Sequence, residues 1–479
     1  MKYVITAEEM KRTETEFMRR TGYPSLLLME HAAQAVAEET RRHAENAVFF
    51  CGPGNNGGDG YAAARLFAQA GGRAEVWALS DPEALRGDAL TNARLCAALS
   101  VPVKRWTKET PLPQGCGAIV DAMFGMGLSR PLEGAYADAA RRINAAGLPV
   151  VAVDMPSGTA ELSVRADVTV TFHKMKLQHA LFPGRENAGR VVVTDIGIPE
   201  DGAGFSVLEE GDVPALLPPR LRNAHKGTCG HALLIAGSRG MAGAAALCAN
   251  AAMRAGAGLC TLLAAEETIP VLQQLAPCAT CLPRESTPPE EALRGKAAFA
   301  AGPGLGRSAE TARILTALCA EKLIPAVWDA DALNWLSEQP QRLGENAVIT
   351  PHPGEAARLL GCGTREITAD PIAAAQALSE KFGCTALLKG AATVIVCGEK
   401  RALNLSGTPG LATGGSGDVL TGVIAGLLAQ GLDLELQLRD LIADAQEVLI
   451  RLGQAVLRLL LAVAVFGDAC GFLEDLPAV

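Results

Sequence analysis

The residues best suited to chemistry lie near the carboxyl end of the chain, where glycines crowd an aspartate. Gly414, Gly415 and Gly417 precede an apolar segment with helical periodicity. Asp418 falls in the first turn of that predicted helix, where unpaired backbone N–H groups attract anions. A carboxylate beside such a cradle is suited to deprotonating a hydroxyl that receives a phosphoryl group. The alternative is an ordinary glycine-rich helix start.

A second group of polar residues follows predicted strands of the first half. The loop GPGNNGGDG (52–60) lacks the glycine spacing of a dinucleotide-binding fingerprint, but its size suits a phosphate. Asn56, Asp121 and Ser157 carry oxygen atoms at three strand ends, a donor set that suits a cation of low charge better than zinc or copper. Asp154 ends an apolar strand and is the predicted acid–base group. Capping of the following PSG turn is its alternative role.

The elements that position these groups alternate between strand and helix. Strands separated by helices predict a parallel sheet in a doubly wound layer, which binds ligands at the carboxyl ends of its strands. In the first half, strands are predicted over 47–52, 74–79, 118–125, 149–158, 166–172 and 190–197, with a helix over 61–72.

The second half repeats this alternation, so the chain is predicted to be an α/β protein of two domains. Residues 200–223 mix Gly, Pro and charge without periodicity, and the predicted domains are therefore 1–212 and 213–479. Two apolar runs around KGAA predict a hairpin over 385–398 that brings Lys389 and Gly390 near a ligand. The other predicted elements are strands within 231–238, 297–306, 325–333 and 347–355 and a helix over 244–258.

The charge balance bears on partners. A net charge of −9 gives no electrostatic support for binding nucleic acid or an anionic membrane. The basic residues His173, Lys174, Lys176 and Arg185 are a local group that either meets a phosphate or forms a solvated face. The apolar stretch 455–466 is too short to span a bilayer and contains an arginine.

Cysteine usage and the first residues bear on the compartment. Thirteen scattered cysteines do not form a disulfide framework and suit a reducing cytoplasm. Cys278 and Cys281 form a lone CxxC without a second pair at zinc-site spacing. The opening MKYVITAEEM lacks the apolar core of a signal peptide. A cytoplasmic protein is expected.

Ordered motifs from both halves resemble the NAD(P)HX repair enzymes. GPGNNGGDG, DAMFGMGLSRPL, VDMPSG and TVTFHKMKLQHALFPG resemble the epimerase domain. KGTCGHALLIAGS, AGPGLG, WDADAL, ITPHPGE, LLKGA and GGSGDVLTGVIAGLLAQG resemble the ADP/ATP-dependent dehydratase domain, a relative of the ribokinases. The resemblance implies a Rossmann-like doubly wound domain followed by a ribokinase-like α/β domain.

The resemblance also implies a repair cycle. Reduced nicotinamide cofactors take up water across C5–C6 and give R and S hydrates, NADHX and NADPHX, which dehydrogenases do not use. The epimerase interconverts the hydrates, and the dehydratase converts the S form to NAD(P)H with ADP or ATP through a phosphorylated intermediate. The implied cofactors are K⁺ and Mg²⁺, and the Ala-rich helices suggest a homo-oligomer.

Site residues of the first domain follow from the matching motifs. The resemblance implies that Asn56, Asp121 and Ser157 bind potassium and that Asp154 contacts the reacting ring. The hydrate's dinucleotide would be held by Asn55, Asn56, Gly57, Gly58 and Asp59, together with Gly125, Met126, Gly127, Leu128, Ser129, Arg130 and Pro131.

Site residues of the second domain follow in the same way. Asp418 would be the base on the C6 hydroxyl, and Gly304 and His352 would contact the hydrate. Asp329 and Asp331 either position magnesium or cap a helix, and capping is the preferred role of Asp331. The nucleotide would be bound by Lys389, Gly390, Ala391, Ala392, Thr393 and Gly417, although an exposed strand-end lysine is the alternative for Lys389.

The sequence departs from the family pattern in two places, and it allows three alternative functions. The segment after Ser157 is short, which trims a loop near the epimerase site, and the tail after about residue 432 is atypical. One alternative is a ribokinase-like small-molecule kinase. Another is a first half that serves as a non-enzymatic binding module. In the third, only the second half is active.

Overall fold

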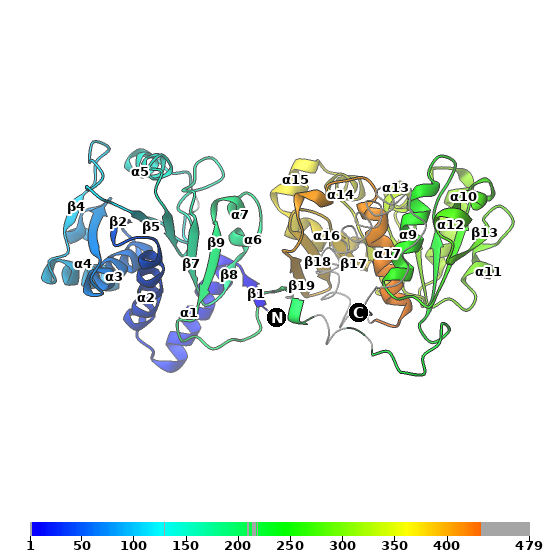
Figure 1. Cartoon of the computed structure of the whole chain (residues 1–479), viewed down its shortest axis with the longest axis horizontal. Helices are drawn as coiled ribbons and strands as arrows, with labels where there is room; N and C mark the ends of the chain where they lie inside the picture. Colours follow the sequence, from blue (N-terminus) through cyan, green and yellow to red (C-terminus); the bar gives the residue numbers. More distant parts are fainter. Residues whose placement is uncertain (1, 129, 208–209, 213–216, 218, 433–479) are drawn as a thin grey trace, which may run out of the picture. The chain divides into compact units, whose positions relative to one another are not determined.

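The chain forms two compact units in the computed structural model (Figure 1), which describes residues 2–128, 130–207, 210–212, 217 and 219–432. One unit comprises Tyr3–Phe205, and the other comprises Lys2 and the described residues from Ser206 onward. Both are α/β, as predicted. Ser129, the apolar stretch 455–466 and the atypical tail lie outside the described residues. Within the described residues, no helix combines the length and apolar character needed to cross a bilayer.

The first unit is built on a seven-stranded sheet in which every neighbouring pair is parallel. The six predicted strands are present. An edge strand over Val103–Arg105 was not predicted, because only three residues carry it. In spatial order the strands are β4 (Val103–Arg105), β3 (Arg73–Ala78), β2 (Asn46–Cys51), β5 (Ala118–Ala122), β6 (Val150–Val153), β7 (Val168–Phe172) and β9 (Arg190–Thr194).

Helices cover both faces of this sheet, because successive strand residues point to opposite sides. Phe49 and Val120 pack with the core formed by α1 to α4, whereas Phe50 and Ile119 pack with α5. This is the predicted doubly wound arrangement. The helices are α1 (Ala7–Thr21), α2 (Ser25–His43), α3 (Asn55–Gln69), α4 (Gly87–Ala98) and α5 (Gly134–Asn144), and the short elements β1 (Lys2–Ile5), β8 (Met175–Lys176), α6 (Leu177–Ala180) and α7 (Gly184–Asn187) complete the unit.

The loop predicted over 52–60 is partly wrong, because α3 begins at Asn55. Its glycines pack the first turn of the helix against strand ends. A Cβ atom at Gly57 would lie 2.0 Å from the carbonyl oxygen of Gly52, and one at Gly60 would lie 2.4 Å from the Cβ of Ala122. The glycines therefore allow the first turns of α3 to pack closely against the sheet, where a loop was predicted.

The second unit has a larger sheet that is parallel from β13 to β17 and antiparallel from β17 to β19. The hairpin predicted around KGAA is confirmed. In spatial order the strands are β13 (Ala279–Pro283), β12 (Leu259–Ala264), β11 (His231–Ile235), β14 (Ala298–Ala301), β15 (Ala326–Trp328), β16 (Ala347–Ile349), β17 (Thr385–Leu388), β18 (Thr393–Cys397), β19 (Lys400–Asn404) and β10 (Phe205–Val207).

Helix α17 (Ser416–Ala429) lies against α9 (Ala242–Arg254) in this unit (Figure 1), and small residues bring the two together. A Cβ atom at Gly422 would lie 2.1 Å from the carbonyl oxygen of Cys248, and one at Gly426 would lie 2.5 Å from that of Ala252. The other helices are α10 (Ile269–Leu275), α11 (Pro289–Leu293), α12 (Ala309–Ala320), α13 (Ala330–Glu338), α14 (Pro353–Leu360), α15 (Thr364–Ala369) and α16 (Pro371–Phe382).

Candidate active sites

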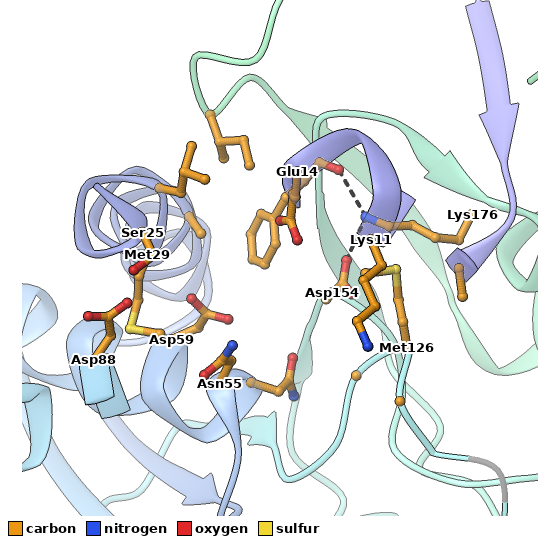
Figure 2. A pocket seen from close by; sticks show the side chains of 18 of the residues that line it. Lys11, Glu14, Ser25, Met29, Asn55, Asp59, Asp88, Met126, Asp154 and Lys176 are labelled. Carbon is orange, nitrogen blue, oxygen red and sulfur yellow. Dashed lines mark hydrogen bonds and ion pairs between the residues drawn. The ribbon is translucent and has the colours of Figure 1, made fainter. Parts of the chain in front are cut away.

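A cavity of about 550 Å³ lies in the first unit, where α1, α2 and α3 meet the loops after β5 and β6 (Figure 2). Because β2, β5, β6 and β7 are parallel neighbours, the residues that follow them meet at one edge of the sheet. Asn55, Asn56 and Asp59 line the cavity from the first turns of α3. Gly125 and Asp154 line it after β5 and β6. Asn56, Asp59 and Asp154 of the predicted strand-end residues therefore share one cavity, whereas Asp121 and Ser157 are not among the described residues that line it.

Asp154 is fixed by a buried lysine. Its Oδ1 accepts hydrogen bonds from the Lys176 Nζ at 2.7 Å and the Thr171 Oγ1 at 3.0 Å. The Lys176 side chain is 1% exposed, and its ammonium also donates to the Thr171 Oγ1 and to the carbonyl oxygen of Phe172. Asp154 adopts φ 61°, a left-handed conformation that is uncommon outside glycine and is often found at functional sites.

Two alternatives for these residues are wrong. The Asp154 carboxylate does not cap the PSG turn, because its hydrogen bonds run to Thr171 and Lys176. The basic group is not a solvated face, because Lys174 and Lys176 are both buried. Lys174 pairs with Glu200 and Asp201 in the same unit.

The free oxygen of Asp154 faces a glycine. A Cβ atom at Gly125 would lie 2.9 Å from the Asn56 Oδ1 and 3.3 Å from the Asp154 Oδ2. The absence of a side chain at this position leaves both oxygens accessible from the cavity. Asn56, Gly125 and Asp154 therefore form one wall around a space that a reacting ring can enter.

Only part of the predicted dinucleotide set borders the cavity. Asn55, Asn56, Asp59, Gly125, Met126 and Gly127 line it. Gly57 and Gly58 are buried and serve packing, since added Cβ atoms would meet Gly52, Met29 or Ala89. Leu128, Arg130 and Pro131 are not among the described residues that line the cavity, and Ser129 lies outside the described residues.

Asp121 and Ser157 are joined directly. The Ser157 Oγ and backbone N–H donate to the two oxygens of Asp121, each at 2.7 Å. Burial raises the pKa of Asp121 to about 6, although hydrogen bonds from Ser157 and the Met123 amide oppose the rise. Among the described residues, the buried Asn56 Nδ2 has no hydrogen-bond partner.

The short segment after Ser157 folds back at once. Gly158 and Ser163 form an isolated β-bridge, and the Val164 N–H donates to the carbonyl oxygen of Ser157 at 2.9 Å. The trimmed loop therefore leaves the contact between Asp121 and Ser157 in place.

The second site lies at the carboxyl ends of β14, β15, β16 and β17, which are consecutive neighbours. The Lys389 Nζ donates to the Asp329 Oδ1 at 3.0 Å, and the Thr421 Oγ1 donates to the Asp329 Oδ2 at 2.8 Å. The alternative of an exposed strand-end lysine is therefore wrong, since the Lys389 side chain is only 21% exposed and is paired. Ala330, next to Asp329, adopts φ 47°, a second uncommon conformation at a site.

The two aspartates of WDADAL do not cap α13 with their side chains. Asp329 occupies the N-cap position but makes no side-chain cap bond. The Asp331 Oδ2 accepts from the backbone N–H of Gly306 at 2.8 Å, so the preferred capping role of Asp331 is wrong. The reason is tertiary: the glycine loop after β14 offers a donor that helix periodicity alone does not reveal.

Asp418 lies in the first turn of α17, as predicted. Gly415 is the N-cap residue and adopts φ 93°, which glycine tolerates. A Cβ atom at Gly417 would lie 3.5 Å from the Lys389 Nζ, so the lysine faces the helix start. Burial and the charge of Asp329 raise the pKa of Asp418 to about 6, while Lys389 opposes the rise.

The remaining predicted residues of the second domain differ in their contacts and burial. The Gly304 carbonyl oxygen accepts from the Ser238 Oγ at 2.8 Å. His352 is the N-cap of α14, and its Nδ1 accepts from the Gly354 N–H at 3.0 Å. This ring therefore has a structural role, and its side chain is also 53% exposed. Gly390, Ala391 and Ala392 lie in the turn between β17 and β18, and Thr393 is the first residue of β18; Ala392 and Thr393 are buried.

Sequence reasoning missed the contribution of residues before position 47. Lys11 and Glu14 of α1 line the first cavity, as do Ser25 and Met29 of α2. The Thr6–Glu9 capping box was a readable signal for the start of α1. The ion pairs made by Lys176 and Asp329 carried no sequence signal, because their partners are distant in the chain.

Comparison with known proteins bears on both units. Residues 25–178 match the family model described as YjeF-related protein N-terminus, and residues 232–448 match the one described as NAD(P)H-hydrate dehydratase. A bifunctional NAD(P)H-hydrate repair enzyme of Moorella thermoacetica is 37% identical over 90% of this chain and 88% of its own length. The enzyme of the same name from Escherichia coli is 34% identical over 89% of this chain and 85% of its own length.

The chain belongs to the bifunctional NAD(P)H-hydrate repair enzymes. This membership confirms the predicted family and fold class. Among solved structures, an ADP/ATP-dependent NAD(P)H-hydrate dehydratase of Bacillus subtilis, co-crystallised with ATP/Mg²⁺, is 32% identical, covers 50% of this chain and 85% of its own, and gives a TM-score of 0.43. A ribokinase-like superfamily protein of Enterococcus faecalis is 29% identical, with 50% and 84% coverage and a TM-score of 0.46.

Proposed function

We propose that the domain 1–212 interconverts the R and S hydrates of NADH and NADPH and that the domain 213–479 dehydrates the S form with ADP or ATP. The cluster of Asp418 with Lys389 and Asp329, beside the start of α17, carries the dehydratase part of this proposal. It joins a proton acceptor, a cation and the amino-terminal end of a helix, which are the parts that phosphoryl transfer to a hydroxyl requires.

In the second site, Asp418 takes the proton of the C6 hydroxyl while the hydroxyl oxygen attacks the terminal phosphorus of the nucleotide. The backbone N–H groups from Gly415 to Gly417 and the Lys389 ammonium stabilise the charge on the phosphoryl group. Cleavage of the C6–O bond with loss of a C5 proton then releases phosphate and restores the C5–C6 double bond. Gly304, His352, Gly390, Ala391, Ala392 and Thr393 are the proposed binding residues around this centre.

Magnesium fits this site as a companion of the nucleotide. Both oxygens of Asp329 already accept hydrogen bonds, and one oxygen of Asp331 is bonded to the Gly306 amide. Mg²⁺ commonly binds through substrate phosphates with few protein ligands and neutralises the charge that develops during transfer. We therefore assign no protein carboxylate as its direct ligand.

In the first site, Asp154 contacts the ring through its Oδ2, and residues 55–59 and 125–131 bind the dinucleotide. Of these, Asn55, Asn56, Asp59, Gly125, Met126 and Gly127 line the cavity. Asn56, Asp121 and Ser157 fit potassium, because one carboxylate with an amide and a hydroxyl oxygen supplies hard donors of low total charge. When bound, K⁺ supplies a fixed positive charge that favours ionised Asp121. Replacing K⁺ by tetramethylammonium should slow epimerisation and leave dehydration unchanged.

The relatives favour repair over the kinase alternative, since their name applies to enzymes that match both halves of this chain. A homo-oligomer is supported by exposed apolar side chains on α9 and α10, namely Leu247, Val271 and Leu275. A reducing cytoplasmic setting is supported by the cysteines, since all twelve that the structure describes are free. Light scattering on the purified protein tests the oligomer.

The decisive experiment follows absorbance of reduced nicotinamide while the protein acts on mixed R and S NADHX with ADP or ATP and Mg²⁺. Complete recovery of NADH at an enzyme-dependent rate is expected. Recovery that stops at the S fraction would leave the second domain alone active. No recovery with either nucleotide would overturn the repair function, and a stable phosphorylated product would indicate a kinase.

A further inference from the structure

One face of α1 lines the cavity of the first unit, yet its charged residues have no role in the function proposed above. The helix is fixed at its start by reciprocal hydrogen bonds between Thr6 and Glu9. Residues spaced three or four apart share one side of a helix. The cavity-lining residues with this spacing are Ala7, Lys11, Glu14 and Met18.

Glu14 contrasts with Asp154 in its surroundings. In Figure 2 the Glu14 side chain extends from α1 toward the cavity, and within the described residues it forms no hydrogen bond or ion pair. Burial raises the pKa of Glu14, the charge of Lys176 opposes this rise, and the charge of Asp154 adds to it. Asp154 is instead hydrogen-bonded to the Lys176 ammonium. Glu14 thus faces the cavity without a partner among the described residues, whereas Asp154 is held by one, and two carboxyl groups on one cavity can act as acid and base on the same substrate.

The charge of the cavity favours a cationic intermediate. The described residues that line it include the carboxyl groups of Glu8, Glu14, Asp59, Asp88 and Asp154 and two lysines, Lys11 and Lys176. Burial raises the pKa of Asp59 well above its usual range and also raises the pKa of Glu14, which becomes a carboxylate once it gives up its proton. In the hydrate, C6 carries the hydroxyl and is bonded to the ring nitrogen N1. Loss of the hydroxyl leaves a positive charge shared by N1 and C6, which nearby carboxylates stabilise. Ring opening to an aldehyde, the other route to inversion, forms no such cation.

We propose that Glu14 is a catalytic acid of epimerisation and that the reaction proceeds by cleavage of the C6–O bond; this rests on the epimerase function proposed above. The proton of the Glu14 carboxyl passes to the hydroxyl oxygen, the C6–O bond breaks, water leaves, and the N1 lone pair forms an N1=C6 bond. A water molecule then adds to C6 from the other face. The N1=C6 pair returns to N1, and the Asp154 Oδ2 takes the proton from that water. In the reverse direction the two carboxyl groups exchange roles.

Matched variants of one helix test the role of Glu14. Glu14→Gln should slow interconversion of R and S NADHX, measured by chromatography without nucleotide, at least about 100-fold. Glu16→Gln removes the same charge from an exposed position of α1 outside the cavity and should keep the wild-type rate. Nucleotide-dependent dehydration of the S hydrate should persist in both variants. A wild-type rate of epimerisation in Glu14→Gln would overturn the proposal, as would loss of activity in Asp59→Asn but not in Glu14→Gln.

An isotope measurement tests the route without any variant. Wild-type protein that epimerises NADHX in ¹⁸O-labelled water should place one ¹⁸O in the hydrate per inversion, above the exchange seen without protein. Inverted hydrate that retains its original oxygen would overturn C6–O cleavage and the proposal with it. If wild-type protein does not interconvert the hydrates at all, the proposed function of the first domain fails instead.

Discussion

The two units hold a carboxylate at the same topological position, the carboxyl edge of parallel strands, but surround it differently. Asp154 shares one oxygen with the buried ammonium of Lys176. Asp418 forms no ion pair within the described residues, because the nearby Lys389 is bonded to Asp329. Burial and the Asp329 charge raise the pKa of Asp418 to about 6. Asp154 is thus fixed by an ion pair, whereas burial raises the pKa of Asp418 and leaves its carboxylate able to take a proton.

The largest effect should come from Asp418→Asn, which tests whether the two carboxylates act independently. Loss of a general base costs about 10²–10⁴-fold, so nucleotide-dependent NADH formation should fall by about 10³-fold. Epimerisation without nucleotide should be unchanged. Equal loss of both reactions would contradict the division between units. Absorbance reports the first reaction and chromatography of the hydrates the second.

Lys176→Met should break the feature that distinguishes the first site. It leaves the Asp154 carboxylate buried without its partner, which costs about 3–5 kcal/mol of unfolding free energy. Denaturant unfolding of the first unit measures this loss. Lys11→Met, at an exposed position of the same cavity, is the control and should be near neutral. Adding Asp154→Asn to Lys176→Met should restore part of the stability, and no restoration would contradict a pairing role.

The pH dependence of the nucleotide-dependent reaction should report the ionisation of Asp418 in the second site. A base with a pKa of about 6 loses its ionised form below that pH, so the nucleotide-dependent kcat should fall about tenfold per pH unit below 6. In Asp329→Asn the midpoint should move to lower pH, because the Asp329 charge raises the pKa of Asp418 and because Lys389 is released from its pair. A midpoint that stays fixed in Asp329→Asn would contradict electrostatic coupling.

The smallest effect concerns the contact that positions α17. Gly422→Ala forces a Cβ atom against the Cys248 carbonyl oxygen, and overpacking of this kind costs about 1–3 kcal/mol. Gly243→Ala adds the same methyl group to α9 at a position with no atom within 4 Å and should not destabilise the protein. Thermal unfolding of both variants gives the comparison. Equal melting temperatures would contradict a tight α9–α17 contact.

These two sites also show how far the sequence leads. Asp418 was predictable, because three glycines, a first-turn aspartate and a helical stripe all lie within a few residues of each other. Asp154 was found as a strand-end residue, but Lys176 was not, since 22 residues separate the pair and no periodicity connects them. The loop predicted over 52–60 was partly wrong for a similar reason. Gly60 packs against the distant Ala122 and Gly58 against Met29 and Ala89, so tertiary contact decides where α3 begins.

The sequence analysis did not predict that α1 lines the cavity, because the charged residues of α1 resemble the polar side of a surface helix. Lys11 is exposed and Glu14 half-buried, and only the cavity between α1 and β6 reveals their common direction. Asp331 illustrates the opposite error. A sequence reading favours helix capping, but the Gly306 amide from another loop is its partner. Local patterns therefore predicted the strands and the reactive carboxylates, whereas their partners depended on the fold.

The complete enclosure of Lys176 has a consequence for chemical labelling. Its ammonium donates to the Asp154 Oδ1, the Thr171 Oγ1 and the Phe172 carbonyl oxygen, so no proton is left for solvent. An amine-reactive reagent needs a nitrogen that it can reach, and the Lys176 Nζ is buried and hydrogen-bonded while the fold is closed. Lys11, exposed in the same unit, offers a reference that reacts without opening. The labelling rate of Lys176 relative to Lys11 therefore measures how often the first unit opens around its reactive carboxylate.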